Sequence, residues 1–418
     1  MTRPLDNVQM IYFTFYFRPN DAATLTTIEL IRLLLELRVK VYLLSADHFT
    51  YYYKMKTLEM LKRELGSNIE KVVLVSDSFE VPLSSNKIFN SLRVLTLPSM
   101  LYYQSLSFLK HQEIDFTLSQ AHIFHLTPIC SYFLKLLKKI PMIVKIHDLF
   151  PSLERPIEAN IERTVMLDFY KSLLKSADFA LIQSHEMRYL MKRESFSTEN
   201  LLIFPNTISI RFREKTDVLF KKVGNQLVEK YPILESQGVK LIYVGKIYKD
   251  RGLKTFIDYL NYVARKLDVK LIIIGRQMDE NIIRLLKKEE YQKNVSYIGE
   301  IPHELVPIFI KFSDLPIGSL KRGWHTIGAV PRKVLEYFIL EKPVLSIKGS
   351  ATRELINEKT SLIINNLEDL KQLNRLIEEA NLSKLGLHAF ETVKKYYITE
   401  NYKRLMYEII SNIILGSV

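Results

Sequence analysis

Short apolar runs alternate with longer amphipathic stretches along almost the whole chain. Leu253, Phe256, Ile257 and Leu260 follow the three-and-four spacing of a helix with one apolar face. Runs rich in β-branched residues predict buried strands at 40–45, 142–146, 179–184, 240–245, 270–275 and 295–299. Strands that alternate with helices are typical of α/β folds, in which helices cover both faces of a parallel sheet.

The alternation runs through the chain twice, and this predicts two domains. The first series ends near "LLIFPNT" (201–207), and a polar, lysine-rich stretch separates it from a second series that begins at Lys240. We expect an α/β protein of two doubly wound, Rossmann-like parallel-sheet domains that face a cleft. The predicted boundaries are 1–210 for the N-terminal domain, 211–238 for an interdomain segment, 239–398 for the C-terminal domain and 399–418 for a C-terminal helix that crosses back to the first domain.

Composition and charge narrow the classes of function. The single cysteine, Cys130, allows no internal disulfide, which suits a reducing cytoplasm. The apolar run near the start lacks a small-residue cleavage site and predicts a first strand, and no apolar run reaches the roughly 18 residues of a membrane span. The net charge of +13 favours anionic ligands. Because the cations are spread through predicted helices, we expect phosphorylated small molecules or an anionic membrane surface as partners, and no nucleic acid.

The sequence lacks the motifs of several common α/β enzymes. It has no Gly-x-Gly-x-x-Gly dinucleotide fingerprint, no Gly-x4-Gly-Lys-Ser/Thr phosphate loop, no His-Glu-x-x-His and no Gly-x-Ser-x-Gly. It also has no Asp-x-Asp, so no two-carboxylate clamp for a metal-bound nucleotide is visible. We therefore expect neither a metal ion nor a cofactor.

The stretch "YVGKIYKDRGLKTF" (243–256) places two cations around the end of a predicted strand. Lys246 follows the strand, and Arg251 opens the next helix. Ligands of open parallel sheets bind outside the carboxyl ends of the strands. Two cations at that edge can hold a diphosphate, since a charge-assisted hydrogen bond contributes about 1.5–3 kcal/mol. The alternative is that both are solvated loop residues.

A second charged group lies in "AVPRKVLEYFILEKPVLS" (329–346). Pro331 suits the start of a helix, where its missing N–H is no loss. Arg332 and Lys333 add positive charge to a helix end whose unpaired amides already favour an anion. Glu336, one turn further, can accept hydrogen bonds from sugar hydroxyls. The alternative is a surface ion pair between Lys333 and Glu336.

Taken together, these stretches resemble glycosyltransferase family 4, nucleotide-sugar enzymes with the two-domain GT-B fold. Lys246 and Arg251 correspond to the family's diphosphate-binding cations with the two residue types exchanged, and Glu336 with "EKPVLS" matches the second half of its two-glutamate motif. Three more segments resemble family segments: "IHDLFPSLERP" (146–156), "LLIFPNT" (201–207) and "NVSYIGEIPHELVPIFIKFSDL" (294–315).

The resemblance implies that a sugar moves from a nucleotide-diphosphate sugar to a glycan or lipid-linked saccharide, with retention of configuration and without a metal. The N-terminal domain would face the acceptor and the C-terminal domain would bind the donor. Lys246, Arg251, Arg332 and Lys333 would hold the donor diphosphate. Contacts to the donor ribose and sugar would come from Glu336, Gly328, His325 and Glu300.

Several positions depart from the family pattern. The residue eight positions before Glu336 is Gly328, where the family has its first glutamate, so Arg322, Trp324 and His325 become candidates for sugar contacts. Thr127 stands where the family often has a histidine, with His125 two residues before it.

His147 is then the best-placed imidazole, at the carboxyl end of a predicted strand and beside Asp148. Either residue could accept the proton of the acceptor hydroxyl, a role that contributes roughly a hundred- to ten-thousandfold in rate. The alternative is that the pair caps a helix entry and shapes the loop.

Basic and aromatic segments of the first domain, at 48–65 and 99–112, suggest a peripheral site at the cytoplasmic face of a membrane. The alternative is that these helices cover the sheet. Two other functions stay open on sequence alone. The first is a degenerate GT-B protein that binds a nucleotide as a scaffold subunit, and the second is a nucleotide-sugar epimerase.

Overall fold

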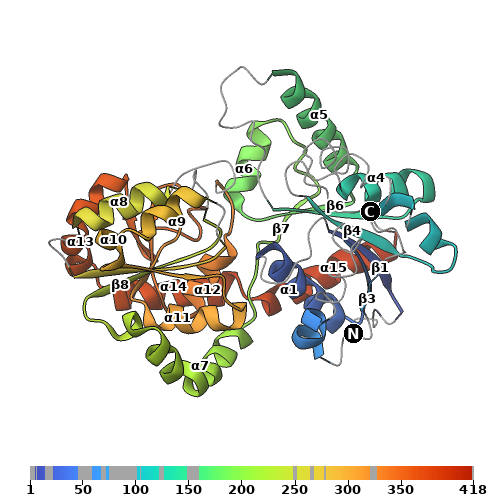
Figure 1. The fold of residues 1–418 in the computed structure, drawn as a ribbon. Helices are drawn as coiled ribbons and strands as arrows, with labels where there is room; N and C mark the ends of the chain where they lie inside the picture. The colour runs from blue at the N-terminus through green and yellow to red at the C-terminus, as the bar shows by residue number, and fades with distance from the viewer. Residues whose placement is uncertain are drawn as a thin grey trace. The chain divides into compact units, whose positions relative to one another are not determined.

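The computed structural model divides the chain into two compact units, Met1–Pro205 with Thr399–Val418, and Asn206–Ile398 (Figure 1). The structure describes residues 5, 7–14, 22–45, 59–66, 72–74, 101–103, 105–121, 127–147, 160–247, 252–263, 268–276, 279–320 and 327–416. Each unit is built on parallel sheet. The expected α/β class, with two parallel-sheet units, is thereby confirmed.

The first unit has a seven-stranded parallel sheet in the order β3-β2-β1-β4-β5-β6-β7. Its strands are β1 Gln9–Thr14, β2 Lys40–Ser45, β3 Val72–Leu74, β4 Phe116–Ala121, β5 Met142–Ile146, β6 Phe179–Ile182 and β7 Leu201–Ile203. Its helices include α1 Ala22–Glu36, α4 Thr127–Lys138, α5 Asn160–Ser176, α6 His185–Arg193 and α15 Lys403–Ile414.

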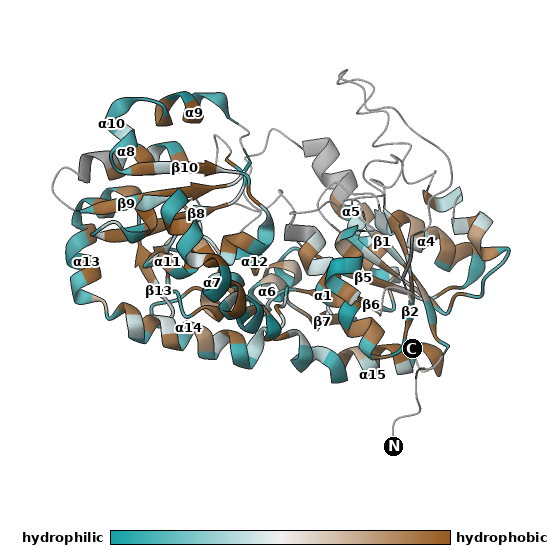
Figure 2. Cartoon of the chain, turned by 60° about the horizontal axis from the view of Figure 1, so that its bottom comes forward, coloured by the Kyte–Doolittle hydropathy of each residue, from teal (hydrophilic) through white to brown (hydrophobic). Residues whose placement is uncertain are grey.

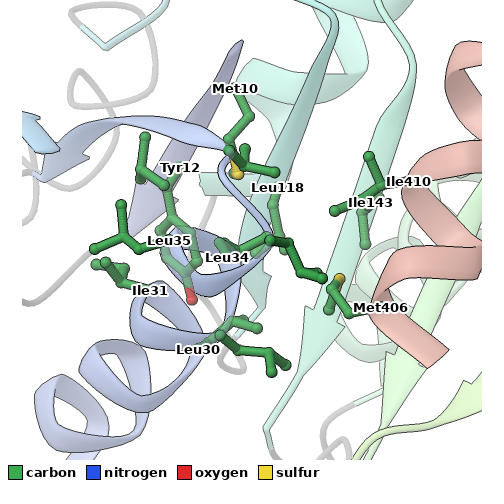
Figure 3. Close-up of a cluster of buried hydrophobic side chains, with 14 of the residues drawn as sticks. Met10, Tyr12, Leu30, Ile31, Leu34, Leu35, Leu118, Ile143, Met406 and Ile410 are labelled. Atoms are coloured by element: carbon green, nitrogen blue, oxygen red, sulfur yellow. The ribbon is translucent and has the colours of Figure 1, made fainter. Parts of the chain in front are cut away.

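Alternate residues of the strands fill cores on both faces of this sheet. On one face, Met10 and Tyr12 pack with Leu34 of α1 and with Met406 and Ile410 of α15 (Figure 3). The last helix of the chain thus packs into the core of the first unit. On the other face, Ile11 and Phe13 pack with Cys130 and Leu134 of α4.

The second unit has a four-stranded parallel sheet in the order β10-β9-β8-β11, and a bridge between Ile317 and Leu345 connects it to the pair β12-β13. Its strands are β8 Val239–Val244, β9 Val269–Ile274, β10 Val295–Gly299, β11 Leu315–Pro316, β12 Val344–Ile347 and β13 Ser361–Ile364. Its helices are α7 Arg211–Lys230, α8 Leu253–Val263, α9 Glu280–Leu286, α10 Glu289–Gln292, α11 Val306–Phe312, α12 Arg332–Ile339, α13 Leu373–Glu379 and α14 Leu382–Tyr396.

All six strands predicted from apolar runs are present, with shifts of one or two residues at some ends. The strands of the second unit are almost uniformly hydrophobic, whereas α14 has a polar and an apolar side (Figure 2). The segment expected to join the domains, 211–238, contains the 20-residue helix α7 and groups with the second unit. Its Phe212, Leu219 and Phe220 pack against that unit's core, although most other residues of the helix are polar.

Candidate active site

Three charged side chains follow three neighbouring strands at the carboxyl edge of the second unit's sheet. Lys246 comes after β8, Arg276 after β9 and Glu300 after β10. These strands are adjacent in the sheet and parallel, so their ends meet at one edge. That edge is where ligands of open α/β sheets bind.

Glycines allow the ends of β8 and β9 to approach closely. Gly275 has a φ of +148°, and a Cβ on it would lie 1.9 Å from the carbonyl oxygen of Gly245. Just beyond, the Ile247 N–H donates to the carbonyl oxygen of Arg276 at 3.0 Å. The backbones of Lys246 and Arg276 therefore lie side by side because no side chain separates the strands that precede them.

Arg276 and Glu300 form a bidentate pair across this edge. Nε of Arg276 donates to Oε2 of Glu300 and Nη2 to Oε1, both at 2.9 Å. The hydrogen bonds and charge of Arg276 lower the pKa of Glu300, and the charge of Lys246 adds to this effect. Both side chains of the pair are exposed, so the edge presents a mixed, net positive surface to solvent.

The first turn of α12 lies next to the end of β8. The Lys333 ammonium stands 4.7 Å from the centre of the Tyr243 ring, a cation–π distance. The Tyr243 hydroxyl in turn donates to the carbonyl oxygen of Lys246 at 3.2 Å. The two charged stretches that the sequence singled out, 243–256 and 329–346, are thus brought together through one tyrosine.

Glu336 is buried and held from two sides. Its Oε1 accepts hydrogen bonds from Nε of Arg332 and Nε2 of His303, each at 3.1 Å. Burial by itself would raise the pKa of Glu336, but attraction to His303 and Arg332 outweighs burial and lowers it. Glu336 therefore stays an anion, with its Oε1 held by two donors.

The start of the second unit is tied to this helix. Arg332, itself buried, also donates from Nη1 to the carbonyl oxygen of Thr207 at 2.7 Å. Asn206 donates from Nδ2 to the carbonyl oxygen of Val330 at 2.9 Å. The guanidinium of Arg332 is consequently engaged inside the protein, whereas Lys246 is exposed.

The remaining predicted donor residues divide into two groups. Gly328 is buried and has a φ of +68°, a left-handed backbone that favours glycine. Arg251 and His325 lie outside the described residues, as do Arg322 and Trp324. The roles predicted for all of these positions stay predictions.

In the first unit, His147 directly follows β5 and is buried. Its N–H donates to the carbonyl oxygen of Ala121 at 3.0 Å, and its own carbonyl oxygen accepts from Nε2 of Gln183. Thr127 is buried at the start of α4, while Asp148 and His125 are outside the described residues.

Other buried polar groups gather at the same carboxyl edge of the first sheet. Gln120 accepts from the Thr14 hydroxyl at 2.8 Å and donates to Thr27 at 2.5 Å. Ser119 and Ser131 share a short hydrogen bond. The described side chains named here are polar and neutral, whereas those named at the edge of the second sheet are charged.

Sequence reasoning missed two residues of this site. Arg276 follows an apolar strand just as Lys246 does, so the same strand-end rule would have found it. His303 carried no such signal, because its contact with Glu336 joins positions 33 residues apart. Within the described ranges, no group of three or more His, Cys, Asp or Glu side chains is arranged to hold a metal ion.

Comparison with known proteins shows the class of the second unit. Residues 230–392 match the family model of glycosyl transferases group 1. An uncharacterized glycosyltransferase of Methanocaldococcus jannaschii is 23% identical over 301 residues, which cover 69% of this chain and 72% of that protein. The protein is therefore an enzyme, a glycosyltransferase with a group 1 domain.

Solved structures show the fold at the level of the whole chain. Sucrose-phosphate synthase of Thermosynechococcus elongatus superposes with a TM-score of 0.73 at 12% identity, covering 98% of this chain and 100% of that one. HepE of Anabaena in complex with UDP and glucose superposes with a TM-score of 0.66 at 14% identity, covering 97% of this chain and 100% of that one. The chain has the GT-B fold of two Rossmann-like domains.

Proposed function

We propose that the protein is a family 4 enzyme that transfers a sugar from a nucleotide-diphosphate sugar to a glycan or lipid-linked saccharide. The observation that carries the proposal is that Tyr243 contacts both the Lys246 carbonyl oxygen and the Lys333 ammonium at the carboxyl edge of the second unit's sheet. Glu336 lies one turn further along the helix of Lys333 and is held by Arg332. This edge offers cations for a diphosphate and a fixed carboxylate for ribose hydroxyls. The likeness to HepE, which was solved with UDP and with UDP-glucose, makes uridine nucleotides the first donors to try.

In the proposed reaction, the bond between the anomeric carbon and the diphosphate oxygen breaks, and the acceptor hydroxyl oxygen bonds to that carbon. Negative charge then grows on the leaving diphosphate while the sugar becomes oxocarbenium-like. Lys246, Lys333 and Arg251 would stabilise that charge, which makes transfer without a metal ion chemically reasonable. Arg332 was predicted to contact the diphosphate as well, but its guanidinium bonds to Glu336 and Thr207, so we assign it to orienting Glu336.

The acceptor would bind at the polar edge of the first unit's sheet. Neutral hydroxyl and amide groups lie near that edge, and those of Thr14, Gln120 and Thr27 form a buried hydrogen-bonded layer beneath it. His147 lies at that edge and, with Asp148, would take the proton of the attacking hydroxyl. We expect retention of configuration, which proton NMR of the product's anomeric coupling would test.

Calorimetric titration of the full chain tests the donor site. UDP, GDP and ADP, and then their sugars, would be titrated into wild type, Lys246→Ala/Arg251→Ala and the control Lys384→Ala, an exposed lysine of α14. We expect one nucleotide to bind and the double variant to lose at least tenfold in affinity, because charge-assisted hydrogen bonds contribute about 1.5–3 kcal/mol each. Unchanged binding by the double variant would contradict the assignment of the diphosphate site.

Turnover assays with the nucleotide sugar that binds, with and without acceptor, separate this proposal from the scaffold and epimerase alternatives. A scaffold would bind a nucleotide and consume no sugar donor in the presence of any acceptor. An epimerase would convert the free nucleotide sugar with no acceptor present. The match to the group 1 domain favours transfer. Adding EDTA to an active assay tests metal independence, and a loss of activity restored by Mg²⁺ would count against it.

A further inference from the structure

Tyr243 stands one residue before the end of β8, and its ring belongs to the core of the second unit. The residue is 5% exposed and lies in the apolar cluster that includes Leu241 and Ile273. Packing in that cluster would be served by leucine or phenylalanine. The hydroxyl, however, leaves the core and donates to the carbonyl oxygen of Lys246 at 3.2 Å. The polar end of this side chain therefore does something that packing does not require.

Tyr297 of β10 provides a matched case on the same face of the sheet. Tyr243 and Tyr297 both pair with Ile273 of β9, from its two sides. The Tyr297 hydroxyl donates to the carbonyl oxygen of Gly275 at 3.0 Å, just past the end of β9. Both tyrosines thus bond to a carbonyl group beyond a strand end. Of these two rings, that of Tyr243 alone has the ammonium of a described residue over it.

That ammonium belongs to Lys333, in the first turn of α12. Its Nζ lies 4.7 Å from the centre of the Tyr243 ring, where the negative face of the ring attracts a cation. A lysine ammonium on its flexible stem can take many positions, and the ring favours one of them. The first turn of a helix also attracts anions through its amides and dipole. One tyrosine thus fixes the backbone of Lys246 and restrains the ammonium of Lys333.

We propose that Tyr243 is a positioning residue that makes the donor site select diphosphates over monophosphates and nucleosides. The inference rests on the proposed function, because it takes Lys246 and Lys333 as the cations that bind the diphosphate. Cations that are held in place bind an anion with a smaller loss of side-chain freedom. A diphosphate has two phosphoryl groups and can contact both lysines, whereas a monophosphate has one. Tyr243 acts through the two lysines and does not itself contact the donor.

Calorimetric titration of the full chain with UDP, UMP and uridine tests the proposal. The guanosine or adenosine series replaces this one if GDP or ADP is the nucleotide that binds. Tyr243→Leu removes the ring and the hydroxyl, so we expect losses of about tenfold for UDP, about threefold for UMP and less than about twofold for uridine. Tyr243→Phe keeps the ring beneath Lys333 and should recover most of the UDP affinity. The control Tyr297→Phe loses a similar hydroxyl bond and should change all three affinities alike, by less than about twofold.

A double-mutant cycle separates positioning from packing. Lys333→Ala should by itself lose about tenfold in UDP affinity and little in uridine affinity. Adding Tyr243→Leu to Lys333→Ala should reduce UDP affinity by at most about threefold more, because the restrained ammonium is already gone. If Lys333→Ala weakens UDP and uridine equally, the ammonium does not act on the diphosphate. The proposal then fails even if Tyr243→Leu does not fold.

Three results for Tyr243→Leu would overturn the proposal. They are equal losses for UDP and uridine, an unchanged affinity for UDP, and effects that add fully to those of Lys333→Ala. The first would assign Tyr243 to folding alone. Failure of the proposed function gives a different pattern, in which Lys246→Ala/Arg251→Ala binds UDP like wild type or wild type binds no nucleotide. A loss in that double variant beside unchanged binding by Tyr243→Leu would reject the positioning role and leave the donor site standing.

Discussion

Two arginine–glutamate pairs of the second unit have nearly the same bond lengths and very different surroundings. Arg332 and Glu336 meet at 3.1 Å with side chains 5% and 4% exposed. Arg276 and Glu300 meet at 2.9 Å with side chains 49% and 40% exposed. Water screens the second pair and replaces either partner when one is removed, whereas the first pair has only the protein around it. The comparison teaches that burial, more than distance, decides what such a pair contributes.

Removing one partner of the buried pair should have the largest effect. Arg332→Ala leaves Glu336 as a buried carboxylate whose remaining hydrogen-bond donor, among the described side chains, is His303. It also removes the hydrogen bond from the guanidinium to the carbonyl oxygen of Thr207. We expect a loss of about 3–5 kcal/mol in the free energy of unfolding, the usual result when a buried charge loses its partner. Urea denaturation would measure it.

Lys333→Ala is the matched control for that experiment. It removes a cation from the next position of the same helix turn, but the Lys333 ammonium is only half-buried, over the Tyr243 ring. Its loss of stability should be about 1 kcal/mol or less. Equal losses of stability in the two variants would show that the buried Arg332–Glu336 pair contributes no more to folding than a half-buried cation does.

Lys145 of the first unit is a third case, a buried cation with no acidic side chain beside it among the residues that the structure describes. Its Nζ lies 3.5 Å from the carbonyl oxygen of Pro205 and 4.8 Å from the centre of the Phe204 ring. Burial lowers the pKa of Lys145 to about 7. Because the unfolded chain keeps its proton up to the ordinary value near 10.5, wild-type stability should rise with pH between about 7 and 10.5.

Lys145→Met should therefore stabilise the protein, the opposite sign to Arg332→Ala. The gain should be several kcal/mol at pH 6, since the pKa falls from 10.5 to about 7 and each unit of pKa corresponds to about 1.4 kcal/mol. It should shrink towards pH 10. Urea denaturation at both pH values measures it, with Lys175→Met on α5 as an exposed control. A destabilised variant at pH 6 would show that Lys145 has a compensating partner in the folded state.

The sequence predicted Lys246 at the sheet edge but neither Arg276 nor the burial of the Arg332–Glu336 pair. Lys246 was found because strand ends in α/β sheets follow from local pattern, and Glu336 because a helix start carried an unusual density of charge. The burial of Arg332 and its bond to Thr207 depend on residues 125 positions apart, which no local pattern encodes. Helix α7 was read as a connection because its sequence is polar and rich in lysine, which hides the apolar stripe that packs against the core.

His303 gives a smaller and more selective effect. If it orients Glu336 for the donor ribose, as the proposed function requires, His303→Ala should raise the donor KM about tenfold and leave kcat within about twofold, because the lost contact acts on binding. His303→Gln keeps a donor near the Nε2 position and should recover most of the affinity. If Glu336→Gln abolishes donor binding while His303→Ala changes nothing, the orienting role of His303 fails and the role of Glu336 stands.

The smallest effect on stability should come from the exposed pair, and it completes the comparison. Arg276→Ala should change the free energy of unfolding by about 0.5 kcal/mol or less, because both side chains are solvated. The pKa of Glu300 is lowered in the folded state, so this contribution is present at neutral pH and is lost as the pH falls through the folded-state value. Salt at 0.5 M should remove most of it by screening. A loss comparable to that of Arg332→Ala would mean that Arg276 has further partners at the sheet edge, and that exposure does not set the energy of these pairs.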